Sequence, residues 1–174
     1  GFAALIPVAV LAFATMETVA PADSGSLSEF GIYFSDPLFF KLLAPVFGIN
    51  LNFPIIANPF YFAAWVGLLV TALNLFPSGQ LDGGHALYAV FGSKIHLWSG
   101  RIVFISAAIL AISGWFLYNS PSGFLFAVLL GVMMRVGHPE PYDDAPLDLR
   151  RKAVAALTLL IFILSFTPFP IQIK

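Results

Sequence analysis

A polar motif between residues 74 and 85 carries the clearest chemical signal in this sequence. It reads Asn74-Leu75-Phe76-Pro77-Ser78-Gly79-Gln80-Leu81-Asp82-Gly83-Gly84-His85 and closes an uncharged apolar run that begins at Pro59. A charged side chain at membrane depth costs about 2.5–3.5 kcal/mol on insertion scales, so it is expected where a metal, another cation or a proton pathway offsets the cost. Asp82 is therefore a candidate functional carboxylate.

Local chemistry allows two interpretations of Asp82. Pro77 disfavours helix at the residue before it, and the nearby glycines permit a tight turn, so the apolar helix is predicted to break or kink here. Asp82 then stands at the start of a second helical segment, Gly83 to about Phe91, where its carboxylate can cap backbone N–H groups. A carboxylate kept ionised in this way is also suited to bind zinc as a hard oxygen ligand.

The composition predicts that these residues are positioned by membrane helices. Hydrophobic residues make up 59% of the chain and charged residues only 10%, far from the values of soluble domains. We predict an all-α polytopic membrane protein in which residues 1–174 form one membrane-embedded domain with no separate soluble domain. About five transmembrane helices are expected from the apolar runs at 2–16, 59–76, 102–118, 123–136 and 153–169.

Charge and cysteine content narrow the function classes. The net charge of −1 argues against nucleic acid as a partner, because nucleic-acid binding requires a basic face. The chain has no Cys, so a zinc site would need His, Asp or Glu ligands.

The turn chemistry and the basic residues predict a topology. Asn119-Ser120-Pro121-Ser122-Gly123 predicts an abrupt reversal between the third and fourth runs; because 123–136 is short, a re-entrant pair is the alternative to full crossing. Five crossings place six basic residues on the Asp82 side and two on the other, so the Asp82 side is predicted to be cytoplasmic. The six are Lys94, Arg101, Arg135, Arg150, Arg151 and Lys152, and the two are Lys41 and Lys174.

The segment 17–58 is too long for a simple turn, and its stretch Asp36–Gly48 is apolar but interrupted by Pro and Lys. We predict an interfacial or re-entrant element on the outer side. It is either an ordinary membrane-surface loop with a short helix or a functional element, namely a gate or a substrate-contact element.

The motif Asn74-xx-Pro77-xxx-Leu81-Asp82-Gly83-Gly84-His85 resembles the second signature of the site-2 protease family of intramembrane zinc metalloproteases. The C-terminal run resembles the tail of prokaryotic members; it comprises His138-Pro139-Glu140-Pro141, Asp143-Asp144, Pro146-Leu147-Asp148-xx-Arg151 and a last apolar helix ending Phe166-Thr167-Pro168-Phe169-Pro170. The resemblance covers about residues 58–170.

The resemblance implies a zinc site and its substrates. In that family, two His of a His-Glu-x-x-His helix and the Asp of the Leu-Asp-Gly motif bind Zn²⁺, and the Glu activates a water that attacks a peptide bond within a membrane helix. Asp82 matches the metal ligand, and Asn74 matches the Asn that is thought to bind substrate or stabilise the developing oxyanion. The implied partners are single-span membrane proteins and the lipid bilayer, and the implied location is the prokaryotic inner membrane as a multi-pass protein.

One departure from the family pattern is serious. None of His85, His96 and His138 is followed by the Glu and second His of the first signature. We expect residues 1–174 to be a C-terminal part of a larger membrane protease, with that motif and its catalytic Glu upstream of Gly1. This chain alone would then contain no catalytic residue, lack two zinc ligands and be inactive. The alternatives are an inactive protease homologue and a non-enzymatic binding or transport module with Asp82 as a proton or cation site.

The remaining His and Trp residues are predicted to have structural roles. His85 is expected to hydrogen-bond near the helix break, His96 to lie in a cytoplasmic loop, and His138 to lie in a solvated loop. Trp65, Trp98 and Trp115 are at most interface anchors. The sequence indicates neither the substrate's identity nor the oligomeric state.

Overall fold

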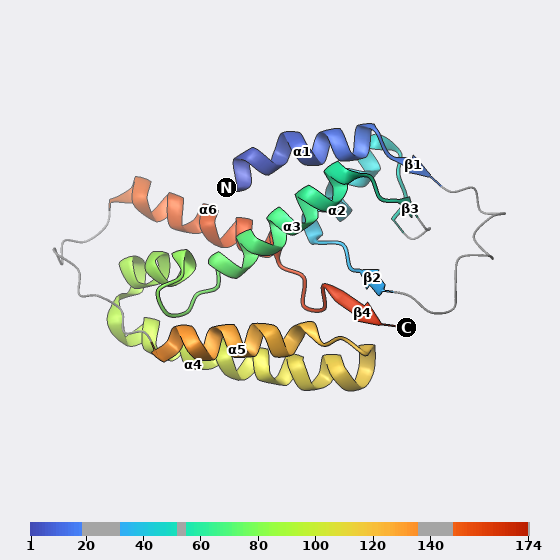
Figure 1. Ribbon diagram of the computed structural model, residues 1–174. Helices are drawn as coiled ribbons and strands as arrows, with labels where there is room; N and C mark the ends of the chain where they lie inside the picture. The colour runs from blue at the N-terminus through green and yellow to red at the C-terminus, as the bar shows by residue number, and fades with distance from the viewer. Residues whose placement is uncertain (19–31, 52–54, 136–147, 174) are drawn as a thin grey trace.

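The computed structural model describes residues 1–18, 32–51, 55–135 and 148–173, and most of them are helical (Figure 1). The predicted apolar runs coincide with helices, so the mostly α character of the fold is confirmed. The helices are α1 (Phe2–Ala14), α2 (Leu38–Leu43), the 3-10 helix η2 (Ala44–Phe47), α3 (Pro59–Asn74), α4 (Asp82–Tyr118), α5 (Ser122–Arg135) and α6 (Leu149–Ser165).

Two small antiparallel sheets correct the all-α prediction. Strand β1 (Glu17–Thr18) pairs with β3 (Ile55–Ile56), and β2 (Ile32–Phe34) pairs with β4 (Ile171–Ile173). Strands of two or three residues are too short to show the alternating pattern that identifies a strand in a sequence. The second sheet fastens the C-terminal end of the chain to the segment that precedes α2.

Helices α1 and α3 lie side by side (Figure 1). With α2 they surround a core rich in aromatic side chains. The Phe13 ring meets the Phe40 ring edge-on at a centroid distance of 5.2 Å. Trp65 is only 5% exposed and its Nε1–H donates to the Ser35 carbonyl at 2.9 Å. The prediction that Trp65 is at most an interface anchor was therefore wrong, because the face of α3 that carries Trp65 packs inside the protein.

Helix α4 contains a break at Gly92, whose φ of 77° and ψ of −179° are not helical. The first part of α4 therefore ends near Phe91, where the sequence predicted it to end. Helical structure resumes directly after the break, so His96 lies in a helix, is 5% exposed and packs edge-on against Tyr88 at 5.6 Å. The prediction of a loop position for His96 was wrong because a single glycine accommodates the change of direction.

The predicted hairpin between the third and fourth apolar runs is confirmed. Asn119 ends α4 in the left-handed conformation with φ 46°, and α5 begins at Ser122 and packs back along α4 (Figure 1). A Cβ atom on Gly123 would lie 2.5 Å from the Ala111 Cα atom, so this glycine permits the close approach of the two helices.

Among the residues that the structure describes, one helical stretch, Lys94–Tyr118, is long and apolar enough to cross a membrane. A span requires about 20 residues, and the other apolar helices are shorter: Phe2–Ala14, Leu38–Phe47, Pro59–Asn74 and Ser122–Met133. The five-span topology and the single membrane-embedded domain therefore stay predictions.

Candidate metal and substrate site

The predicted helix break lies between Asn74, the last residue of α3, and Asp82, the first residue of α4. The connecting loop is held by contacts from later parts of the chain. The Ser99 hydroxyl donates to the Pro77 carbonyl at 2.9 Å. A Cβ atom on Gly79, whose φ is 58°, would lie 2.7 Å from the carbonyl oxygen of Met133 in α5. The loop is thus fixed between the second part of α4 and the end of α5.

The two glycines after Asp82 allow the loop to lie directly against the first turn of α4. A Cβ atom on Gly83 would lie 1.9 Å from the Leu75 carbonyl oxygen, and one on Gly84 would lie 2.5 Å from the Gly79 carbonyl oxygen. Backbone atoms cannot move aside as a flexible side chain can. Both glycines are therefore required for the position of Asp82 relative to the end of α3.

The structure corrects the capping interpretation of Asp82. Leu81 occupies the N-cap position of α4, and no side-chain capping hydrogen bond forms there. Asp82 instead follows as an exposed residue in the first turn, where the positive end of the helix dipole favours a negative charge. The chain enters the helix one residue earlier than capping by Asp82 would require, so its carboxylate is available for another role.

Asn74 and Asp82, the two predicted site residues, line the same cavity of about 180 Å³. Its walls come from four helices: Gly1 and Phe2 lie at the start of α1, Thr71 in α3, Asp82 in α4, and Thr158 and Ile161 in α6. The complete lining is Gly1, Phe2, Thr71, Asn74, Leu75, Asp82, Thr158 and Ile161.

Sequence reasoning missed the contributions of α1 and α6 to this cavity. Thr158 carried a usable signal, because it is the one polar residue within the apolar run 153–164. Its hydroxyl donates to the Val154 carbonyl at 3.0 Å, and the Thr71 hydroxyl donates to the Gly67 carbonyl at 2.7 Å. Both threonine hydroxyls thus bond within their own helices.

Asp82 is a single potential metal ligand in this cavity. Within the described ranges, no group of three or more His, Cys, Asp or Glu side chains is placed to hold a metal ion. His85 lies on α4 and is exposed, while His138 lies outside the described residues. An exposed carboxylate beside a small cavity with a mixed polar and apolar lining suits one ligand position of a zinc site. The described residues offer no second His, Cys, Asp or Glu ligand in this cavity.

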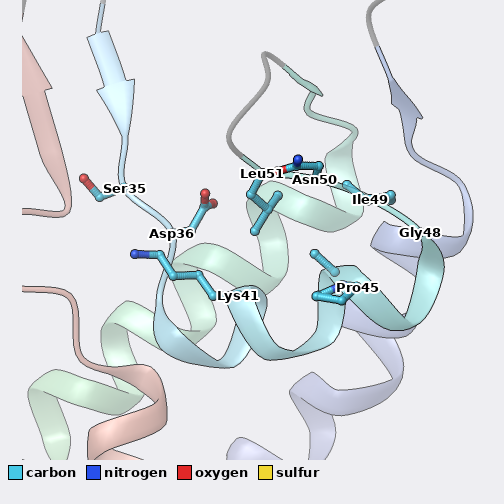
Figure 2. A pocket seen from close by; sticks show the side chains of 9 residues that line it. Ser35, Asp36, Lys41, Pro45, Gly48, Ile49, Asn50 and Leu51 are labelled. Carbon is cyan, nitrogen blue, oxygen red and sulfur yellow. The ribbon is translucent and has the colours of Figure 1, made fainter.

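A larger cavity of about 720 Å³ lies in the region predicted to be interfacial or re-entrant (Figure 2). Asp36 and Lys41 extend into it, and the Tyr61 hydroxyl donates to the Asp36 carboxylate. Burial raises the pKa of the Asp36 carboxyl, although the Tyr61 hydrogen bond and the Lys41 charge both act to lower it. Tyr61 and Asn74 lie about 20 Å apart along α3 at 1.5 Å rise per residue, so this cavity is separate from the Asp82 cavity.

A comparison with protein-family models matches residues 18–117 to Peptidase family M50. The match covers more than half of the chain and includes Asn74 and Asp82. The chain therefore belongs to Peptidase family M50, the site-2 protease family. The match begins before the predicted start at residue 58 and does not include the C-terminal run that the sequence resemblance extended to residue 170.

Most of the curated relatives that match are named as probable zinc metalloproteases of plants; one shorter match is to the DDT domain-containing protein PTM of Arabidopsis thaliana. Probable zinc metalloprotease EGY2, chloroplastic, of Oryza sativa subsp. indica is 33% identical over 115 residues, which are 65% of this chain and 20% of the relative. Probable zinc metalloprotease EGY2, chloroplastic, of Arabidopsis thaliana is 31% identical over 116 residues, which are 65% of this chain and 19% of that relative. The chain thus spans about a fifth of the length of these relatives. No solved structure matches the chain.

Proposed function

We propose that the full-length protein is an intramembrane zinc metalloprotease in which Asp82 supplies the third zinc ligand and Asn74 contacts the substrate. The observation that carries this proposal is the cavity lined by both Asp82 and Asn74. The Asp82 carboxylate is exposed and does not cap α4, and the Asn74 amide lines the same cavity. Membership of the M50 family and the zinc metalloprotease relatives support the same reading.

The other two zinc ligands are proposed to come from a His-Glu-x-x-His helix outside this chain. Gly1 and Phe2 line the Asp82 cavity, so a segment preceding Gly1 would enter next to Asp82. Two His four positions apart face the same side of a helix and, with Asp82, would complete the three protein ligands of a catalytic zinc site.

Asp82 and Asn74 would then have different roles in the reaction. A bound zinc ion would supply an activated water by lowering its pKa to about 7. Asp82 would hold the metal with its negative charge, and the Asn74 amide would donate a hydrogen bond to a substrate carbonyl oxygen as negative charge develops there. An amide does this without adding charge to the site. The upstream Glu would act as the general base.

The proposed setting is a membrane in which the five long helices are embedded, with the stretch Lys94–Tyr118 long enough to cross it. Large apolar side chains along α4 are exposed, including Ile102 at 59%, Ile109 at 61% and Phe116 at 78%; such a surface suits contact with lipid or with other helices. The start of α4, the end of α5 and the start of α6 lie at one end of the structure (Figure 1).

The basic residues indicate which end faces the cytoplasm. Arg135 ends α5, and Arg150, Arg151 and Lys152 begin α6, so the Asp82 end is proposed to be cytoplasmic. Single-span membrane proteins are the proposed substrates. The prokaryotic inner membrane stays a prediction, since the named zinc metalloprotease relatives are chloroplast proteins.

Metal analysis tests the proposed function directly. The full-length protein should retain about one zinc per chain after dialysis, whereas residues 1–174 alone should retain none with comparable affinity, because one carboxylate is too few for a tetrahedral site. Stoichiometric zinc on residues 1–174 would show that the His residues of this chain act as ligands. Absence of zinc from the full-length protein would contradict the proposal.

Asn74→Leu in the full-length protein is expected to lower cleavage by about 10- to 1000-fold, the loss typical of an oxyanion or positioning donor. Zinc content should not change, because Asn74 is not a ligand in this proposal. Zinc content, melting temperature and turnover are measured on the same purified variant. A lower melting temperature with unchanged turnover per molecule would assign Asn74 a structural role instead.

A further inference from the structure

A second, apolar cavity adjoins the Asp82 cavity. It has a volume of about 240 Å³ and lies between the first part of α4, the loop that connects α3 to α4, and α6. Leu75 and Thr158 line both cavities, so the two are neighbours across a shared wall. Its lining is Leu75, Pro77, Gly83, Ala86, Leu87, Val90, Phe91, Lys152, Ala155, Ala156, Thr158 and Leu159.

The chemistry of the lining restricts what this cavity can hold. Lys152 is the one charged residue in it, and Thr158, the other polar one, bonds within its own helix. Pockets that bind whole small molecules measure about 300–1,000 Å³, so a cavity of about 240 Å³ is too small for most such ligands. It is large enough for one apolar side chain.

We propose that this cavity is a specificity subsite that receives one large apolar side chain of the substrate, of the size of Leu or Phe, beside the cleaved peptide bond. The inference rests on the proposed protease function. A chain whose backbone passes Asn74 and Asp82 has the apolar cavity directly alongside, and burying an apolar side chain there removes it from water. The cavity thus adds a preference for residue size to the reaction at Asp82.

Small residues on two walls create the space. Ala86 comes from α4, whereas Ala155 and Ala156 come from α6. A larger side chain at either wall would occupy the volume that the substrate residue needs. Each methylene in an apolar enzyme pocket changes kcat/KM by about 10- to 200-fold, so Leu should be preferred over Ala by at least about 10-fold.

The experiment uses the full-length protein and a series of single-span model substrates. In each substrate, one of the four residues before or the four residues after the cleaved bond is changed to Gly, Ala, Leu or Phe. The cleavage site of each substrate is assigned by mass spectrometry. In the wild type, one position should show kcat/KM for Leu and Phe at least about 10-fold above that for Ala. Zinc content is measured in parallel on every variant.

Two variants fill the cavity from opposite walls. Ala156→Phe and Ala86→Leu should each remove the preference for Leu over Ala at that position while zinc content stays at the wild-type level. Ala153→Phe is the matched control, because Ala153 is exposed on the same helix but does not line the cavity; it should leave the preference unchanged. If Ala156→Phe and Ala86→Leu give the same result, misfolding of one variant does not explain it.

The outcomes separate this inference from the function on which it rests. If both filling variants bind zinc and cleave with the wild-type preference, the subsite is overturned and the protease function stands. If the wild type neither binds zinc nor cleaves any substrate of the series, the proposed function is overturned and the subsite with it.

Discussion

Asp82→Asn in the full-length protein is expected to abolish stoichiometric zinc binding and to lower cleavage by more than about 100-fold, since even residues that only orient a metal ligand contribute about 10- to 100-fold. The amide keeps the size of the side chain but removes the negative charge that holds the metal. Because Asp82 makes no capping hydrogen bond, the variant should remain folded and membrane-inserted. Zinc content, turnover and melting temperature of one preparation check all three expectations.

Asp148→Asn provides the matched control for this experiment. The Asp148 carboxylate does cap a helix, accepting a hydrogen bond from the Arg151 backbone N–H at 2.9 Å. Asn caps helices about as well as Asp, so this variant should behave like the wild type in zinc content and turnover. Turnover of Asp82→Asn close to that of Asp148→Asn would remove Asp82 from the metal site.

Gly83→Ala is expected to be the most damaging substitution that adds a single methyl group. The new Cβ atom would overlap the Leu75 carbonyl oxygen, at 1.9 Å, and would lie 2.8 Å from the Phe76 carbonyl oxygen. Overpacking typically destabilises a protein by about 1–3 kcal/mol, and a displacement of about 1 Å in a catalytic group can reduce turnover about 100-fold. Melting temperature and turnover should therefore both fall.

Gly100→Ala tests whether this effect is specific to the position. A Cβ atom on Gly100, which also lies in α4, would meet only the Ser78 hydroxyl oxygen at 3.5 Å, an ordinary contact. Replacing a helical glycine by alanine stabilises a helix by about 0.8–1.0 kcal/mol, so this variant should be neutral or slightly stabilised. Similar losses in both variants would contradict the role assigned to Gly83.

Much of this arrangement could be predicted from local sequence. Apolar runs located the long helices, and the proline and glycines located the break, because Pro77 and Gly83 act on backbone conformation at their own positions. Asp82 stood out as an isolated carboxylate, and the spacing from Asn74 to Asp82 carried the family resemblance that the M50 match confirmed. The end of the first part of α4 near Phe91 followed from the same kind of reasoning.

Only the tertiary structure decided which residues from distant parts of the chain lie next to Asn74 and Asp82. Gly1 and Thr158 line the Asp82 cavity from opposite ends of the chain, and helix packing between such remote segments leaves no periodic signal in the sequence. Burial of Trp65 and His96 likewise depends on which helix face turns inward. The capping role of Asp82 was excluded by a shift of one residue in the start of α4, a difference in backbone geometry that residue types alone do not specify.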